Sequence, residues 1–166
     1  RAAVLLRPAR MRDVLIDPPS RIARGGAGVL WEEVTVPAGE HGLVALHGSS
    51  PNVGVVGYSL GGGIGWLARS HGLAANSVTA IEIVTAAGEM IRADAQREPE
   101  LYWALRGGGG DFGIVTAMEF RLYPLRTAYA GWLVWDWERA GEVLTAWAEW
   151  TATVPEDLTS VGRLFQ

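Results

Sequence analysis

Cysteine is absent from the 166 residues of this sequence. Its absence excludes a disulfide framework, a thiolate metal site and a cysteine nucleophile within the chain. Because the cytosol keeps thiols reduced and disulfides are rare there, a chain without cysteine is compatible with a cytoplasmic location, which is our expectation.

Lysine is absent too, so all 14 positive charges are arginines, and 18 acidic residues leave a net charge of −4. The arginines are scattered and form no basic stripe of the kind expected for nucleic-acid binding. No apolar run approaches the roughly 20 residues that span a bilayer. We therefore expect neither nucleic acid nor a membrane as a partner.

The chain begins with RAAVLLR, which is too short and too closely bounded by arginine for a signal peptide. There is no initiator methionine, and the first residues are typical of a strand. We therefore expect the sequence to start inside a domain.

Proline and glycine mark most boundaries of the predicted elements. A turn is expected at 17–20, a helix end near Pro37, a helix C-cap at Gly72 and a helix first turn at Pro99. The glycines at 25–28 are expected to break an opening β-meander. Strands are predicted at 4–6, 11–16, 21–24, 78–84, 90–93, 114–122 and 129–137, and helices at 29–36, 67–71, 98–105 and 138–152.

Eight glycines lie between positions 42 and 65. Glycine in regular structure costs about 0.5–1 kcal/mol relative to alanine, so such density needs a compensating use. Tight packing of a strand against a helix is one use, and close approach of backbone N–H groups to an anion such as a pyrophosphate is another. The spacing matches neither the Rossmann fingerprint nor the P-loop, which requires a lysine.

Several signals follow one another in a specific order. SPNVG at 50–54 and LGGGIG at 60–65 precede SHGLAANSV at 70–78, and then comes PELYWALRGGGGDFGIVT at 99–116. From about Val14 to Pro124 the chain closely resembles the FAD-binding domain of the vanillyl-alcohol-oxidase superfamily, in its berberine-bridge-enzyme-like branch. The resemblance implies an α+β fold with an antiparallel sheet flanked by helices, incomplete at both ends, and FAD as the cofactor.

The resemblance also implies which residues lie against FAD. It assigns the V-G-x-x-G loop and the glycine-rich turn to the flavin and its diphosphate, the G-L-A-x-N-V element to a place beside the cofactor, and the F-G-I-V strand to the adenine end. The residues implied at the cofactor are Ser50, Val53, Gly54, Val55, Gly57, Tyr58, Ile64, Ala75, Asn76, Val78, Gly113, Ile114 and Val115.

Two positions depart from the family pattern. Many members attach the flavin to a cysteine at the position of Ser50, whose hydroxyl is a poor nucleophile, so no thioether can form here. Val56 stands where the family usually has glycine. The family's pyrophosphate-cradling loop and flavin-linked histidine would precede Arg1, and we interpret His41, His47 and His71 as loop residues.

The composition changes after Pro124. We predict residues 1–124 to be the C-terminal part of the FAD-binding domain and 125–166 to be the start of the substrate-binding domain. Trp132, Trp135 and Trp137 could line a substrate face, although core packing explains alternate tryptophans more simply. The family takes its catalytic base from later in that domain, so no catalytic residue is assigned here, and no metal site is expected.

The leading hypothesis is an oxidase that transfers hydride from a C–H bond of a small-molecule substrate to flavin N5, with oxygen as acceptor. The alternative is an inactive remnant or interaction module that binds no flavin and self-associates through unpaired strand edges. A third hypothesis is a domain completed by missing segments or by a second chain.

Overall fold

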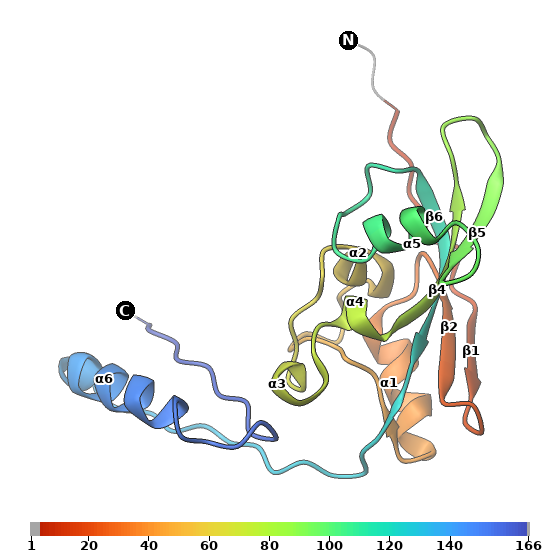
Figure 1. The fold of residues 1–166 in the computed structure, drawn as a ribbon. Helices are drawn as coiled ribbons and strands as arrows, with labels where there is room; N and C mark the ends of the chain where they lie inside the picture. The colour runs from red at the N-terminus through yellow and green to blue at the C-terminus, as the bar shows by residue number, and fades with distance from the viewer. Residues whose placement is uncertain (1–3, 166) are drawn as a thin grey trace.

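A five-stranded antiparallel sheet forms the centre of the computed structural model, which describes residues 4–165. The sheet order is β1 (Val14–Asp17), β2 (Ile22–Gly26), β6 (Ile114–Arg121), β4 (Val78–Val84) and β5 (Met90–Asp94). The strand β6, which comes late in the sequence, therefore lies between β2 and β4 (Figure 1). It links the N-terminal hairpin of β1 and β2 to the hairpin of β4 and β5.

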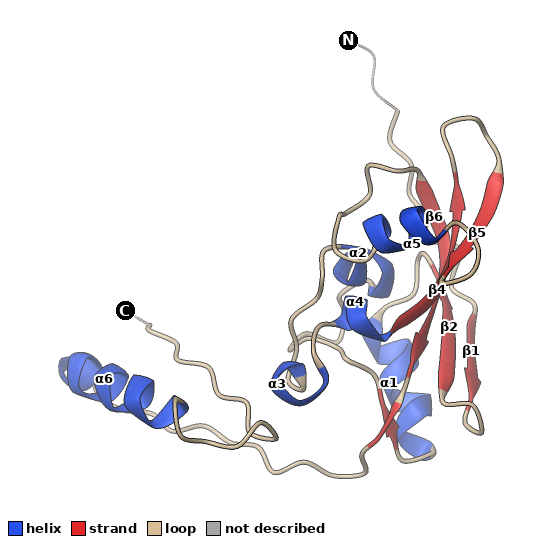
Figure 2. Ribbon diagram, in the orientation of Figure 1, coloured by secondary structure: helices blue, strands red, loops and turns tan. Residues whose placement is uncertain are grey.

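The helices gather on one side of this sheet (Figure 2). They are α1 (Trp31–Glu40), α2 (Val55–Leu60), α3 (Ala68–His71), α4 (Ala74–Ser77) and α5 (Pro99–Leu105). A small second sheet pairs β3 (Leu43–Val44) with β7 (Tyr123–Pro124). Beyond it, η1 (Trp137–Arg139) and α6 (Ala140–Thr151) extend away from the main sheet (Figure 1).

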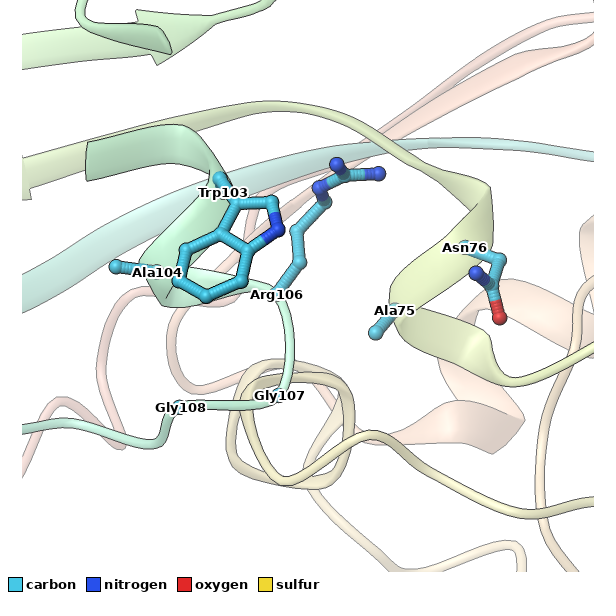
Figure 3. Close-up of a pocket in the computed structure, with 7 residues that line it drawn as sticks. All are labelled: Ala75, Asn76, Trp103, Ala104, Arg106, Gly107 and Gly108. Carbon is cyan, nitrogen blue, oxygen red and sulfur yellow. The ribbon is translucent and has the colours of Figure 1, made fainter. Parts of the chain in front are cut away.

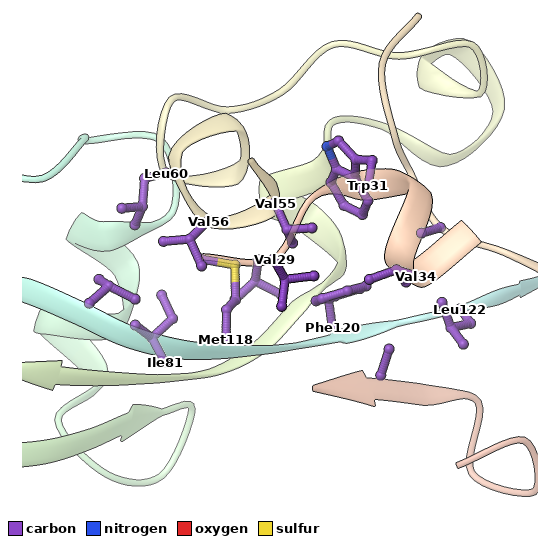
Figure 4. Close-up of a cluster of buried hydrophobic side chains, with 14 of the residues drawn as sticks. Val29, Trp31, Val34, Val55, Val56, Leu60, Ile81, Met118, Phe120 and Leu122 are labelled. Atoms are coloured by element: carbon purple, nitrogen blue, oxygen red, sulfur yellow. The ribbon is translucent and has the colours of Figure 1, made fainter. Parts of the chain in front are cut away.

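The core lies between the helices and the sheet (Figure 4). Trp31, the first residue of α1, is buried with its ring edge-on to Phe120 of β6 at a centroid distance of 5.6 Å. Alternate residues of β4 and β6, such as Ile81 and Met118, complete the layer. Burying one such side chain stabilises the fold by about 1.5–3 kcal/mol.

The opposite face of the sheet is charged. Arg24 of β2 makes two hydrogen bonds to the carboxylate of Glu82 at 2.8 and 3.1 Å. Arg92 of β5 pairs with Glu119 in the same bidentate way, at 2.6 and 2.9 Å. The hydrogen bonds from Arg92 lower the pKa of the Glu119 carboxyl. This face thus carries paired charges where the helix-covered face carries apolar side chains.

Several predicted elements are confirmed. The hairpin of β4 and β5, the helix that begins at Pro99, and the long strand β6 lie where the patterns place them. Gly72 ends α3 with a φ of +81°, as expected of a C-cap glycine. The predicted antiparallel sheet flanked by helices is also correct.

The opening of the chain differs from the prediction. Residues 4–6 and 11–13 form no strand, and Gly25 and Gly26 continue β2 instead of ending it. The reason is a close crossing of the preceding segment: a Cβ on Gly26 would lie 2.5 Å from the carbonyl oxygen of Met11. The glycines therefore admit a neighbouring backbone and do not break the sheet.

The first helix also differs, since α1 continues through Pro37 to Glu40. Proline removes a single backbone donor, whereas ending the helix earlier would withdraw Ala38 from the core. The start is Trp31 and not Val29, because the Glu33 carboxylate accepts the Leu30 N–H at 2.8 Å and closes the first turn.

The predicted strand at 129–137 is wrong. The segment has no strand pairing, and Tyr129 and Trp132 are exposed. Alternation of apolar residues favours an extended chain, but a strand also needs a second strand to hydrogen-bond with. Within residues 4–165 no strand pairs with this segment. The helix predicted after it is confirmed as α6, which buries none of its side chains.

Candidate cofactor site

Two glycine-rich segments that are far apart in the sequence meet in space. The Gly109 N–H donates to the Leu60 carbonyl at 3.0 Å, which joins the 107–110 run to the end of α2. The Ala74 and Ala75 N–H groups donate to the carbonyls of Gly63 and Gly62, which joins α4 to the glycine turn. The structure therefore brings the predicted segments around 57–64, 74–78 and 109–115 into one region.

The loop before α2 is held by the chain that leads into α1. The Val55 N–H donates to the Val29 carbonyl at 2.9 Å, and the Trp31 N–H donates to the Val53 carbonyl at 3.0 Å. Gly54 then acts as the N-cap of α2 with an extended ψ of 128°. Ser50 is exposed, and its hydroxyl donates to the Asn52 side chain at 3.1 Å. Ser50 is thus free to meet a ligand as a hydrogen-bonding group.

Tyr58 organises the glycine turn. Its hydroxyl donates to the Ile64 carbonyl at 2.6 Å, and its ring lies edge-on to Trp31 at 5.6 Å. Burial raises the pKa of the phenol. A Cβ on Gly63 would lie 2.5 Å from the Tyr58 ring, so this glycine cannot be replaced without movement. The tyrosine packs against the turn while Ile64 itself points outward, 76% exposed.

The predicted site residues differ in what they can offer a ligand. Gly57 is exposed with open space where a Cβ would be, and Ile114 is 46% exposed. The side chains of Val55, Val78, Val115 and Ala75 are buried, so these residues could reach a ligand only through their backbone.

Gly113 shapes the start of β6. Its φ is +146°, and a Cβ there would lie 2.4 Å from the Val84 carbonyl oxygen of the neighbouring strand. A side chain at this position would be strained and would clash, so glycine is required at the start of β6.

Asn76 lines a hollow that also includes residues absent from the predicted set. Its side-chain oxygen accepts the Leu73 N–H at 2.8 Å. The hollow has a volume of about 370 Å³ and is completed by Trp103, Arg106 and the glycines after α5 (Figure 3). Arg106 could have been found from the sequence, because it directly precedes four glycines. A charged side chain next to backbone without side chains is a place where a ligand can bind.

The three histidines form no common site. His47 Nδ1 lies 2.7 Å from the Gly48 carbonyl oxygen, and His71 packs against Tyr123 with a centroid distance of 4.4 Å. Across residues 4–165 no three His, Asp or Glu side chains come together as metal ligands would. In the same range no helix has the length and apolar character needed to cross a membrane.

This surface fits a long ligand that is partly apolar and binds through backbone contact. Val53, Ile64 and Ile114 offer exposed apolar side chains. Gly57 and Gly109 have open space where a Cβ would be, so a ligand can approach their backbone closely. FAD has these properties, because it combines a planar apolar ring with a charged diphosphate.

Comparison with known proteins decides the family. A model of the FAD binding domain matches residues 1–94, more than half of the chain. This chain belongs to the FAD-binding family. Its placement among FAD-linked oxidoreductases of the vanillyl-alcohol-oxidase superfamily follows from the relatives, and FAD is the cofactor of the domain.

The relatives of similar sequence are FAD-linked oxidoreductases, and two of them are named oxidases. (R)-6-hydroxynicotine oxidase of Paenarthrobacter nicotinovorans is 40% identical over 126 residues, which cover 75% of this chain and 28% of the relative. Xylooligosaccharide oxidase of Thermothelomyces thermophilus is 35% identical over 168 residues, which cover 95% of this chain and 33% of the relative. This FAD-binding chain thus spans about a third or less of these relatives.

Solved structures show the same fold. A crystal structure of 6-hydroxy-D-nicotine oxidase from Arthrobacter nicotinovorans matches with a TM-score of 0.76 and 38% identity, over 84% of this chain and 32% of that one. Berberine-bridge-enzyme-like 1 of Physcomitrella patens matches with a TM-score of 0.66 and 31% identity, over 69% of this chain and 25% of that one. The branch predicted for this FAD-binding chain is therefore confirmed.

Proposed function

We propose that this chain is part of an FAD-dependent oxidase that removes hydride from a C–H bond of a small organic substrate and uses oxygen as the electron acceptor. Bound FAD would supply the hydride acceptor at its N5 atom. The observation that carries the proposal is the hydrogen bond from Gly109 to Leu60, because it places both glycine-rich segments on one surface.

The chain's own residues would bind and orient the cofactor. Gly57 and the loop that begins at Ser50 would allow close backbone approach, and Ile64 and Ile114 would form apolar contacts. Val55, Val78 and Val115 would contribute backbone groups only, because their side chains are in the core. Tyr58 would act by holding the glycine turn in place.

Small-molecule substrates are supported by the names of the relatives, which include a hydroxynicotine oxidase and a xylooligosaccharide oxidase. The two names describe chemically different substrates, so the shared part of the chain supports the class of reaction and not a particular substrate. We also propose a domain boundary near Pro124, since α6 buries none of its side chains.

The test is FAD binding by the purified chain. We expect flavin absorption bands that leave with the supernatant after acid precipitation, because Ser50 cannot form a thioether. Flavin that stays with the pellet would contradict the non-covalent assignment. A colourless protein that neither binds added FAD nor copurifies with a second polypeptide would contradict the proposal and favour the remnant.

A matched pair of variants links binding to the site. Gly57 in α2 and Gly39 in α1 are both exposed helical glycines with no atom within 4 Å of a built Cβ. Gly57→Leu should keep the fold and weaken FAD binding about tenfold or more by blocking backbone approach, and Gly39→Leu should leave binding unchanged. Equal affinities in the two variants would place the cofactor elsewhere.

A further inference from the structure

The chain exposes more surface than a compact protein of its length does. Its solvent-accessible area is 11115 Å², whereas a folded monomer of 166 residues exposes about 8,000 Å². The difference of about 3,000 Å² is larger than the roughly 800 Å² that each partner buries in a standard protein interface. The chain therefore has enough uncovered surface for a stable contact with a partner.

An exposed stretch joins the main sheet to α6. Every residue from 124 to 139 is exposed, and Leu133 and Val134 are 80% and 86% exposed. From 126 to 135 no N–H or carbonyl group takes part in a backbone hydrogen bond within residues 4–165. Figure 1 shows the stretch leading away from the sheet in extended form. It thus combines apolar side chains with a backbone that is free to pair.

The charges of this stretch are placed symmetrically. Residues 127–135 carry no charge, Arg126 precedes them and Asp136 follows them, so that Gly131 lies midway between the two charges. Neither charged side chain forms an ion pair with another of residues 4–165. The Asp136 carboxylate also makes no capping hydrogen bond to η1. Both charges are therefore available to a partner.

We propose that two copies of this chain associate by antiparallel pairing of residues 127–135 about a two-fold axis at Gly131. In this register Arg126 lies opposite Asp136 of the partner subunit. The two-fold axis repeats this ion pair at the other end of the strands, because both copies present the same surface. Opposite charges directly across an antiparallel pair are stabilising. A shift of one residue would place Arg126 opposite Trp135 of the partner subunit, so the charges select the register.

The side chains also fit this pairing. Trp132 would lie opposite Ala130 of the partner subunit. Val134 would lie opposite Ala128 of the partner subunit, so that in both pairs a large side chain meets a small one. At the axis, Gly131 has no atom within 4 Å of a built Cβ, so its own chain does not block close approach. The proposal depends neither on FAD binding nor on oxidase activity.

Analytical ultracentrifugation of the full chain tests the association. We expect an equilibrium between monomer and dimer that shifts towards dimer as the chain concentration rises, with no larger species, because a two-fold contact is closed. A chain that stays monomeric up to its solubility limit would overturn the proposal. So would open-ended oligomers, or a different polypeptide that copurifies in place of the second copy.

Charge reversal tests the register. Asp136→Arg should weaken dimerisation about tenfold or more, because it places like charges opposite each other at both ends, and Arg126→Asp should do the same. Combining the two substitutions restores opposite charges and should recover the dimer. Glu89→Arg makes the same change of charge in the exposed turn between β4 and β5 and should leave dimerisation unchanged. Folded single variants that dimerise normally, or a combined variant that does not recover, would refute the pairing.

Cross-linking tests the position of the axis without relying on charge. The chain has no cysteine, so one introduced thiol can form a disulfide only with a second copy. Paired residues of antiparallel strands have Cα atoms about 4.5–5.5 Å apart, which a disulfide can span. Gly131→Cys should therefore form a linked dimer on mild oxidation, and Gly141→Cys, at an exposed position of α6, should not. A Gly131→Cys chain that cross-links no more than Gly141→Cys would overturn the proposal.

Pairing would also shield the peptide bond after Arg126 from protease. Trypsin should cut there readily in dilute solution, where the monomer predominates, and more slowly as the chain concentration rises. Cleavage at a rate that does not depend on chain concentration would count against the dimer.

Discussion

Replacing Gly113 by alanine should destabilise the domain, because both the backbone conformation at this position and the space around it exclude a side chain. The φ of +146° is a conformation that side chains disfavour by about 1–3 kcal/mol. The new Cβ would also lie 2.4 Å from the Val84 carbonyl oxygen and 3.0 Å from the Ile83 side chain. The Val84 contact is with the backbone at the end of β4, which cannot move away by rotating a side chain.

We expect Gly113→Ala to lower the free energy of unfolding by about 2–6 kcal/mol, the sum of about 1–3 kcal/mol of backbone strain and about 1–3 kcal/mol for the packing conflict. Urea unfolding followed by tryptophan fluorescence measures this change as a shift of the midpoint at an unchanged slope. Loss on this scale is a large part of the about 5–15 kcal/mol that holds a typical domain together.

Gly110→Ala is the matched control, since it adds the same methyl group to the same loop. Gly110 has no atom within 4 Å of a built Cβ and no positive φ. Its free energy of unfolding should stay within about 0.5 kcal/mol of the unmodified chain. If Gly113→Ala behaves like Gly110→Ala, the close approach of Gly113 to the end of β4 is not as described.

Three further predictions concern other parts of the chain. Tyr58→Phe removes the hydrogen bond to the glycine turn and should cost about 0.5–1.5 kcal/mol in urea unfolding while weakening FAD binding; unchanged FAD affinity would contradict its organising role. Trypsin should cut after exposed Arg126 before it cuts within the main sheet, which mass spectrometry of a time course detects; first cuts within the sheet would contradict the proposed boundary. The pKa of Glu119 is lowered by Arg92, so its stabilising effect is present above the ordinary carboxyl pKa of 4.5 and is lost as the pH falls through the lowered value. Glu119→Gln should therefore be less stable than the unmodified chain at pH 7, and the difference should shrink in urea unfolding at pH 3.

The sequence alone determined the family, the cofactor and the elements governed by local chemistry. The order of the glycine block, the GLAANSV element and the ALRGGGG run is specific because each needs particular residues at particular spacings. The hairpin of β4 and β5 follows from alternation on both sides of a turn, and α5 begins at Pro99 because proline fits a helix first turn. These signals act over a few residues, so they can be interpreted without the fold.

Tertiary structure decided what depends on partners distant in the sequence. Gly25 and Gly26 continue β2 because Met11 crosses them, and 129–137 is no strand because no described neighbour pairs with it. Burial separated Val55, Val78 and Val115, which face the core, from Gly57 and Ile114, which face outward. Arg106 could be placed beside Asn76 only once α4 and α5 were packed on one sheet, because a contact between residues 30 positions apart has no local signature.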